Sequence, residues 1–366
     1  MKKIILIFLI YIIFDTTLNA NPVFSFFNEM KSPELVKLFQ DKTIISNLQK
    51  LHAQVRMGIL DLTDERAQVI RDLNKAGVPV FAWLLLPEEK GYWFNSGNGE
   101  AAIQRYQEIK KWADEHQILF SGIGLDLELD YNDAKLIQSN PWKLIAKIPG
   151  RLYDKTELEK GRKDYTELIK IIKADNYKVE SYYASFIKDE TELNQTSIQQ
   201  ASKFLDIKTD KEIPMLYSSF MGNADGLITI YGLDLKLEAV ALGSTGGGVD
   251  TTLPTLSYDQ LVHDINMASK QVKEVHIFSL EGCVRKGYLS RLVDYNYDSS
   301  LVPDPSQIKA IKNLQKTVKR ISTLLSYPTL LFSVILLILF FIIWLLYFLI
   351  KKLINIINIQ LIKNSV

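Results

Sequence analysis

The sequence predicts a (β/α)8 barrel over residues 21–304, followed by a helix that crosses a membrane. Eight short runs rich in apolar and β-branched residues recur between the two ends of the chain. Amphipathic helical patterns fill many of the gaps, and this alternation is typical of a parallel sheet. Eight strands in about 270 residues match the usual size of such a barrel. A doubly wound open sheet is the alternative, although no G-x-G-x-x-G motif follows the first run.

The eight expected strands are 22–27, 54–60, 78–86, 121–129, 177–186, 213–220, 239–244 and 274–280. Helical spacing of apolar residues predicts helices over 32–42, 63–77, 99–116, 164–176 and 257–271. Ser32 and Thr63 stand where N-caps are expected, and Gly77 stands at a helix end. Strand and helix therefore alternate through most of the expected domain.

The composition excludes several classes of protein. The net charge is +1, so no basic face indicates a nucleic-acid partner. Cys283 is the only cysteine, which rules out a disulfide within the chain. Four scattered histidines show no H-x-H or H-E-x-x-H spacing, so no zinc site is expected.

Both ends of the chain carry membrane signals. Residues 1–20 combine two lysines, a short apolar run and a small-residue end, which is typical of a signal peptide cut after Ala20. An uncleaved anchor is the alternative, but the run is shorter than the roughly 20 residues that a span needs. The run 330–350 has no charge and no proline, so we expect a transmembrane helix over 328–350 with a short tail, 351–366.

The signal peptide places the barrel outside the cytoplasm. The positive-inside rule does not clearly agree, because Lys312, Lys316, Lys319 and Arg320 precede the span. Residues 305–327 carry apolar residues at alternating spacings of three and four. We interpret this segment as a helical stalk, with a short coiled coil or a membrane-surface helix as alternatives.

The expected fourth strand carries the main chemical signal. In 121–130, one face holds Gly122 and Gly124 and then Asp126, Glu128 and Asp130. Active sites of these barrels lie at the carboxyl ends of the strands. Same-face neighbours lie about 6.5–7 Å apart, and two partly desolvated carboxylates at that distance resist ionising together. A general acid beside a charged partner is the pairing used in glycoside hydrolysis; a solvated strand end and a cation site are the alternatives.

The same stretch resembles the motif D-G-x-D-x-D-x-E of the family-18 glycoside hydrolases, the chitinase-like barrels. It keeps the glycine, the last aspartate and the glutamate as Gly122, Asp126 and Glu128, while Ser121 and Gly124 replace the other two acids. The resemblance implies that Glu128 protonates the glycosidic oxygen. It implies that Asp126 steadies an N-acetyl group of the substrate that acts as the nucleophile.

Met215 to Tyr217 resembles a second motif of that family, M-x-Y on strand six, whose tyrosine helps to hold the acetyl group. Ser218 stands where an aspartate usually follows, and the strand-eight run lacks the usual tryptophan. The resemblance covers strand-length motifs and the barrel plan. Lysozyme-like family-25 barrels also use a D-x-E pair, so peptidoglycan is a further candidate substrate.

Further candidates lie at other strand ends. Glu281 follows strand eight in phase with Ser279 and Ile277, and would be a second carboxylate across the mouth. Candidate substrate-binding residues are Trp83, Trp93, Tyr182, Asp130 and Asn28. Aromatic faces stack on sugar rings, and aromatic-lined concave sites are common. Trp142 follows strand four and is expected to cover the site.

The sequence thus predicts an exported, membrane-anchored glycosidase that needs no cofactor. Glu128, Asp126, Tyr217 and, as a lesser candidate, Glu281 would form its catalytic group. The main alternative is a barrel that binds a glycan or another surface partner without cleaving it. A third possibility is a phosphate-binding barrel that uses the glycine-rich loop 243–250, for which a mobile turn is the simpler interpretation. Cys283 is expected to be a small buried residue.

Overall fold

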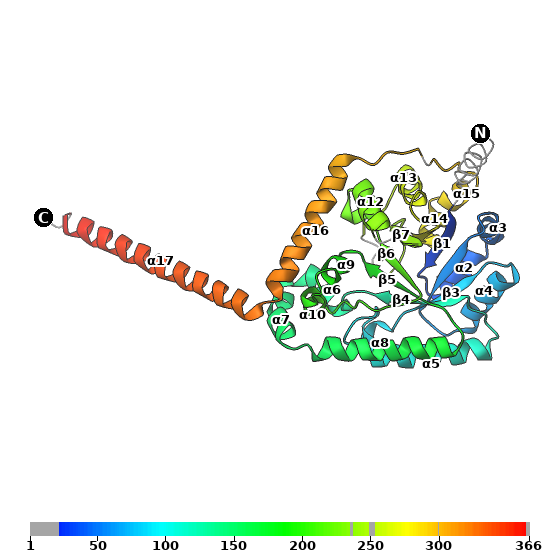
Figure 1. Ribbon diagram of the computed structural model, residues 1–366, viewed down its shortest axis with the longest axis horizontal. Coiled ribbons are helices and arrows are strands. Elements are labelled where there is room, and N and C mark those ends of the chain that lie inside the picture. The colour runs from blue at the N-terminus through cyan, green and yellow to red at the C-terminus, as the bar shows by residue number, and fades with distance from the viewer. Residues whose placement is uncertain (1–21, 235–236, 249–252, 299, 364–366) are drawn as a thin grey trace, which may run out of the picture.

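The computed structural model describes residues 22–234, 237–248, 253–298 and 300–363. These residues form a closed barrel in which the parallel strands β1 to β8 follow one another in sequence order, so the predicted fold is confirmed (Figure 1). The strands are β1 Val23–Asn28, β2 Gln54–Ile59, β3 Val80–Leu84, β4 Gly122–Leu127, β5 Val179–Ala184, β6 Lys211–Met215, β7 Ala239–Gly243 and β8 Glu274–Phe278. Each predicted strand overlaps an observed one. The expected signal peptide, 1–20, lies outside the described residues.

The helices surround the barrel and extend beyond it. They are α2 Ser32–Phe39, α3 Lys42–Lys50, α4 Asp64–Lys75, the 3-10 helix η1 Glu88–Lys90, α5 Gly99–Glu115, α6 Tyr131–Ser139, α7 Pro141–Tyr153, α8 Thr156–Ala174, α9 Phe186–Thr191, α10 Ser197–Ser202, α11 Ser218–Met221, α12 Ala224–Asp234, α13 Tyr258–Ser269, α14 Leu280–Arg285, α15 Tyr288–Val293, α16 Pro305–Leu325 and α17 Pro328–Lys363.

The region of the first predicted helix contains two helices. The helix expected over 32–42 ends at Phe39, and α3 begins at Lys42. The Asp41 side chain accepts a hydrogen bond from the Thr43 N–H at 2.9 Å, which caps this second helix. Ser32 is not the expected cap, because it lies inside α2 and its hydroxyl bonds to Asp61. Thr63 does cap α4, accepting from the Arg66 N–H.

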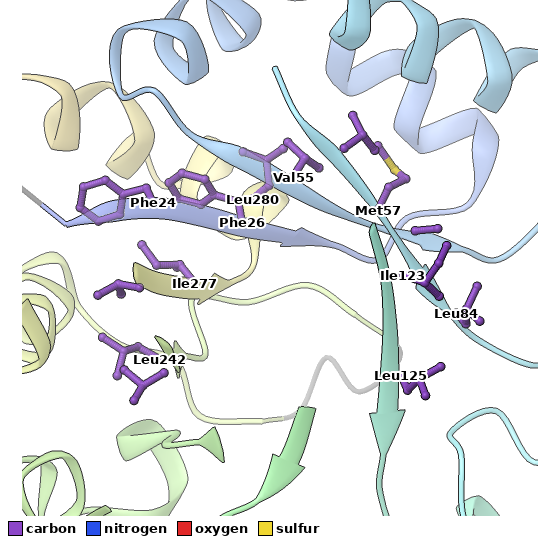
Figure 2. Packing of buried hydrophobic residues seen from close by; sticks show 14 of the residues in the cluster. Phe24, Phe26, Val55, Met57, Leu84, Ile123, Leu125, Leu242, Ile277 and Leu280 are labelled. Carbon is purple, nitrogen blue, oxygen red and sulfur yellow. The ribbon is translucent and has the colours of Figure 1, made fainter. Parts of the chain in front are cut away.

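The outward faces of the strands carry the main hydrophobic core. Alternate residues point outward and pack against the helices, and they are almost completely buried. Figure 2 shows part of this layer: Phe24, Phe26, Val55, Met57, Ile123, Leu125 and Ile277. Burying one such side chain contributes about 1.5–3 kcal/mol, so this layer is the main source of stability.

The interior of the barrel holds a charged layer at the amino-terminal ends of the strands. Arg56 on β2 is fully buried and forms ion pairs with Glu180 on β5 at 2.8 Å and with Glu274 on β8 at 2.9 Å. Although burial alone would raise it, the Arg56 charge holds the pKa of Glu180 below its usual value. Lys211 and His276 also bond to Glu274. This network fills the interior below the layer that carries the candidate site.

The two glycines of β4 make room for neighbouring rings. A Cβ at Gly122 would meet the Phe81 ring at 2.8 Å, and one at Gly124 would overlap the Tyr182 hydroxyl. Both rings come from the adjacent strands β3 and β5. The glycines are therefore required by close approach inside the barrel.

The C-terminal helices α16 and α17 differ in their surroundings. Residues 305–327, expected as a stalk, form α16, which packs along the barrel against α9, α10 and α12 (Figure 1). Ser322 on α16 is fully buried and donates to Glu190 at 2.8 Å. By contrast, α17 projects away from the barrel, and the most apolar window of its segment Pro328–Asn355 has a mean hydropathy of 3.0, with none of that window buried. This helix is long and apolar enough to cross a bilayer.

Candidate active site

A cavity of about 310 Å³ opens at the carboxyl ends of the strands. Its floor and wall are largely aromatic and include Phe27, Trp83, Trp93, Tyr182, Tyr217 and Phe278. The ring centroid of Phe27 lies 4.7 Å from that of Tyr182 and 5.1 Å from that of Trp83, both in edge-on geometry. The cavity therefore combines an apolar lining with the position at which barrels of this type carry their active sites.

Asp126 and Glu128 both line this cavity. Asp126 is the last inward residue of β4 and is 3% exposed, and the Trp83 indole N–H donates to its Oδ2 at 3.2 Å. Glu128 lies one residue beyond β4. Its N–H donates to the Phe94 carbonyl at 3.0 Å, which extends the strand direction by one residue. The two carboxyl groups consequently remain on the same side of the chain.

The surroundings of this pair favour the protonated form of each acid. Burial raises the pKa of Asp126 well above its usual value, and the negative charges of Glu128 and Glu29 raise it further. Burial raises the pKa of Glu128 to about 7. Within the described part of the chain, neither carboxylate has an ion pair with a lysine, arginine or histidine. Each acid of the pair therefore keeps its proton to a higher pH than a free carboxyl group does, and Glu128 keeps its proton to about pH 7.

Glu29 is a third carboxylate of the cavity, and the sequence analysis did not select it as a catalytic or binding residue. It follows β1, lines the cavity and accepts a hydrogen bond from the Tyr92 hydroxyl at 2.5 Å. Burial, followed by the Glu29 charge, raises the pKa of Tyr92, so this hydroxyl remains protonated. The signal was present in the sequence, because Glu29 has the same parity as the inward residues Ser25 and Phe27.

The aromatic candidates also reach the cavity. Trp83, Trp93, Tyr182 and Tyr217 line it, and Tyr182 is the inward member of the pair Tyr182–Tyr183. Tyr182 lies deep, with its hydroxyl bonded to Glu180 of the charged layer. Tyr217 lies immediately before α11, where burial and then the charge of Asp126 raise its pKa well above the usual value.

Two of the predicted residues lie beside the cavity and form part of its support. Glu281 is 1% exposed and belongs to α14, which begins at Leu280. The predicted phase with Ile277 was wrong, because Ile277 faces the outer core and the two-residue period ends with the strand. The Glu281 carboxylate accepts from the Asn28 side chain at 2.9 Å and from the Glu29 N–H at 3.3 Å. Asn28, predicted to bind substrate, is fully buried and holds Glu281.

Two other candidates lie away from the cavity wall. Asp130 was predicted on the same face as Asp126, but its carboxylate accepts from the N–H groups of Asn132 and Asp133 and caps α6. It is also 3.6 Å from the Lys203 ammonium. Trp142, expected to cover the site, lies on α7, is 76% exposed and is no part of the cavity wall.

The glycine-rich loop and the cysteine were the remaining sequence features. Ser244 and Gly247 line the cavity, whereas 249 and 250 lie outside the described residues. Cys283 is fully buried, as predicted, and burial raises its pKa to about 12. No group of three or more His, Cys, Asp or Glu among the described residues is arranged to hold a metal ion. The expectation that the protein needs no cofactor remains a prediction.

Comparisons with known proteins find distant solved structures. No protein-family model matches the chain. No curated protein matches it either. Among solved structures, a 3-keto-D-glucoside 4-epimerase from E. coli has 14% identity and a TM-score of 0.41, over 74% of this chain and 98% of that one. A β-1,3-glucanosyltransferase from Rhizomucor miehei has 11% identity and a TM-score of 0.38, over 70% and 86%. A D-psicose 3-epimerase from Clostridium cellulolyticum H10 has 10% identity and a TM-score of 0.39, over 82% and 99%.

The strand order of the chain itself shows that it is a TIM barrel. The names of two of these distant neighbours refer to a glucoside and a glucan, and at these identities and TM-scores they assign no function to this chain. The resemblance to the chitinase-like family stays at the level of the strand-four and strand-six motifs.

Proposed function

We propose that this protein is a membrane-anchored glycosidase whose main domain lies outside the cytoplasm. The observation that carries the proposal is the carboxyl pair Asp126–Glu128, which shares an aromatic-lined cavity with Tyr217 and has raised pKa values. A carboxylic acid that keeps its proton near neutral pH can donate it to a leaving oxygen. The surrounding rings suit the apolar faces of sugars. The apolar helix Pro328–Asn355 supports the anchor.

In the proposed reaction, Glu128 donates its proton to the glycosidic oxygen as the bond to the anomeric carbon breaks. The oxygen of the substrate's own N-acetyl group then bonds to that carbon, and Asp126 and Tyr217 hold this group in place. Water subsequently attacks the same carbon, the bond from the acetyl oxygen to that carbon breaks, and the N-acetyl group is restored. The proton of the water passes to the Glu128 carboxylate, which restores the acid. The substrate class is accordingly an N-acetylated polysaccharide or a peptidoglycan-like glycan.

The charges around the pair support separate roles for Glu128, as the proton donor, and for Asp126, as the residue that holds the acetamido group. Glu29, which follows β1, lines the same cavity, and after burial and the Glu128 charge its own charge raises the pKa of Asp126. With Asp126 protonated, its hydroxyl donates a hydrogen bond to a neutral acetamido group. Glu281, the lesser catalytic candidate, is held by Asn28 behind Glu29 and would act by positioning.

Turnover by the Glu128→Gln variant tests the proposal. Chitin, peptidoglycan and other polysaccharide fragments serve as natural substrates, and aryl glycosides carrying a dinitrophenyl leaving group serve as activated ones. We expect turnover of the fragments to fall by about 10²–10⁴, the usual contribution of a general acid. Activated substrates should be affected much less, because their leaving group needs no proton. The exposed Glu89→Gln variant is the matched control. Unchanged turnover of a cleaved fragment by Glu128→Gln would refute the assignment.

One observation favours the second candidate, a barrel that binds a glycan without cleaving it. Gly124 stands where the chitinase-like motif has its middle acid, and the Tyr182 side chain occupies the space beside it. The middle acid of the motif, which would precede Asp126 on the same face of the strand, is therefore absent. Calorimetric binding of fragments by the wild-type protein, with no product after long incubation, would favour this candidate.

A further inference from the structure

The helix α7 carries an exposed apolar stripe. Trp142, Ile145, Pro149 and Tyr153 are separated by three, four and four residues, so they lie along one side of the helix. Trp142 is 76% exposed, Ile145 50% and Tyr153 57%. On the neighbouring helix α6, Ile137 is 52% exposed and extends the apolar surface. Large side chains of this kind gathered on one helical hairpin indicate an interaction surface.

The opposite side of α7 is firmly attached to the barrel. Leu152 is buried, and α7 packs against α6 and α10. Arg151 and Lys147 both bond to Asp133 on α6, which is completely buried, at 2.5 and 3.1 Å. The stripe is therefore presented by a fixed helix.

The stripe continues into the start of α17. The Tyr153 hydroxyl lies 3.4 Å from the Thr329 hydroxyl, and the ring centroids of Tyr153 and Phe332 are 6.1 Å apart. Figure 1 shows α7 at the point where α16 meets α17. At 1.5 Å per residue, the uncharged run 330–350 is about 31 Å long, which matches a hydrocarbon core of about 30 Å. The bilayer boundary then falls near Leu330, at the level of Tyr153.

We propose that α7 and the end of α6 lie in the interface of the bilayer that α17 crosses. The apolar side chains of the stripe contact the lipid surface itself. Tryptophan and tyrosine are favoured at that level, and an amphipathic helix there buries its apolar face about 5–10 Å into the boundary. Lys143 on α7 and Lys155, two residues after its end, are exposed and would contact lipid phosphates. The barrel would thus be held to the membrane at two places, which fixes the orientation of its mouth.

This proposal rests on the proposed crossing of the membrane by α17. The test distinguishes a failure of the interfacial helix from a failure of the membrane anchor. The full chain is reconstituted into vesicles of phosphatidylcholine and phosphatidylglycerol. Alkaline carbonate extraction then reports whether the chain is integral. Trp142→Cys is labelled with an environment-sensitive fluorophore, and the buried Cys283 thiol should remain unlabelled. Leu119→Cys, which is 72% exposed on the loop before β4, is the matched control.

We expect the label at position 142 to shift its emission to the blue and to lose intensity when nitroxide-bearing lipids are included. The label at position 119 should show neither change. Extraction of the chain by carbonate would overturn both the anchor and the interfacial helix. A chain that stays in the membrane with equal quenching at positions 142 and 119 would overturn the interfacial helix alone. A blue shift without lipid quenching would indicate a protein partner and would also contradict the proposal.

Discussion

Replacing Glu128 with glutamine should stabilise the barrel at neutral and alkaline pH, although the same change is expected to abolish catalysis. Burial raises the pKa of Glu128 from 4.5 to about 7 in the folded chain. A raised pKa means that the folded state binds more protons than the unfolded state between these two values, so stability falls as pH rises through that range. Glutamine resembles the protonated acid and does not ionise. The Glu128→Gln variant therefore does not lose stability as the pH rises through this range.

The size of the expected stability difference follows from the rise in the pKa of Glu128. At 1.36 kcal/mol per pKa unit, a rise from 4.5 to about 7 corresponds to about 3 kcal/mol above pH 7. For a domain of this size, 1 kcal/mol moves the unfolding midpoint by about 2 °C, so a difference of about 6 °C is expected at pH 8. At pH 4 the two proteins should unfold at similar temperatures, because Glu128 is then protonated in both states.

Thermal unfolding of the full chain in detergent, followed by circular dichroism at one heating rate from pH 4 to pH 9, measures this difference. The Glu89→Gln variant again serves as the control, since Glu89 is an exposed side chain. Midpoints of the wild-type protein and Glu128→Gln that change in parallel over the whole range would show that Glu128 ionises like an ordinary carboxyl group. The electrostatic argument for the site would then be refuted.

Two further changes test the packing and the hydrogen bonding of the cavity. Gly124→Ala should destabilise the barrel by about 1–3 kcal/mol, because the new methyl group overlaps the Tyr182 hydroxyl; Gly150→Ala, where no atom lies within 4 Å, should not destabilise it in the same unfolding assay. Trp83→Phe removes the donor to the Asp126 carboxylate, so it should raise the pKa of Asp126 further; an unchanged carboxyl titration by ¹³C NMR would contradict this.

The strands could be predicted well from the sequence because the periodicity of the apolar residues and the order of the runs along the chain both indicate the same barrel. Apolar runs alternate with helical patterns through much of the domain, so the barrel is largely specified by local information. The missed helix α3 had a local signal as well, in the Asp41 cap two residues before Thr43. What local patterns could not predict was the charged layer. Arg56 reads as one polar residue in an apolar strand, and its partners lie 124 and 218 residues further along the chain.

Two of the errors in the site share one physical cause. Side chains alternate between the two faces only while the backbone remains extended. The sequence-based prediction assumed that this alternation continues beyond the strand ends. Glu128 keeps the expected side because its N–H still pairs with the Phe94 carbonyl. Asp130, two residues later, has turned to cap α6, and Glu281 already belongs to α14. Glu29 follows the inward parity of β1, but no motif accompanies it in the sequence.

The two glycines of β4 explain why the acids that follow them are unusual. Without a side chain at Gly122 and Gly124, the rings of Phe81 and Tyr182 reach across the strand and fill the interior beneath Asp126. Asp126 consequently stands on an apolar floor instead of above the buried ion pairs of the layer below. This floor keeps water and counter-charges away from the pair, and burial is the largest cause of both raised pKa values. The space left by Gly122 and Gly124 thus contributes to the raised pKa values of Asp126 and Glu128.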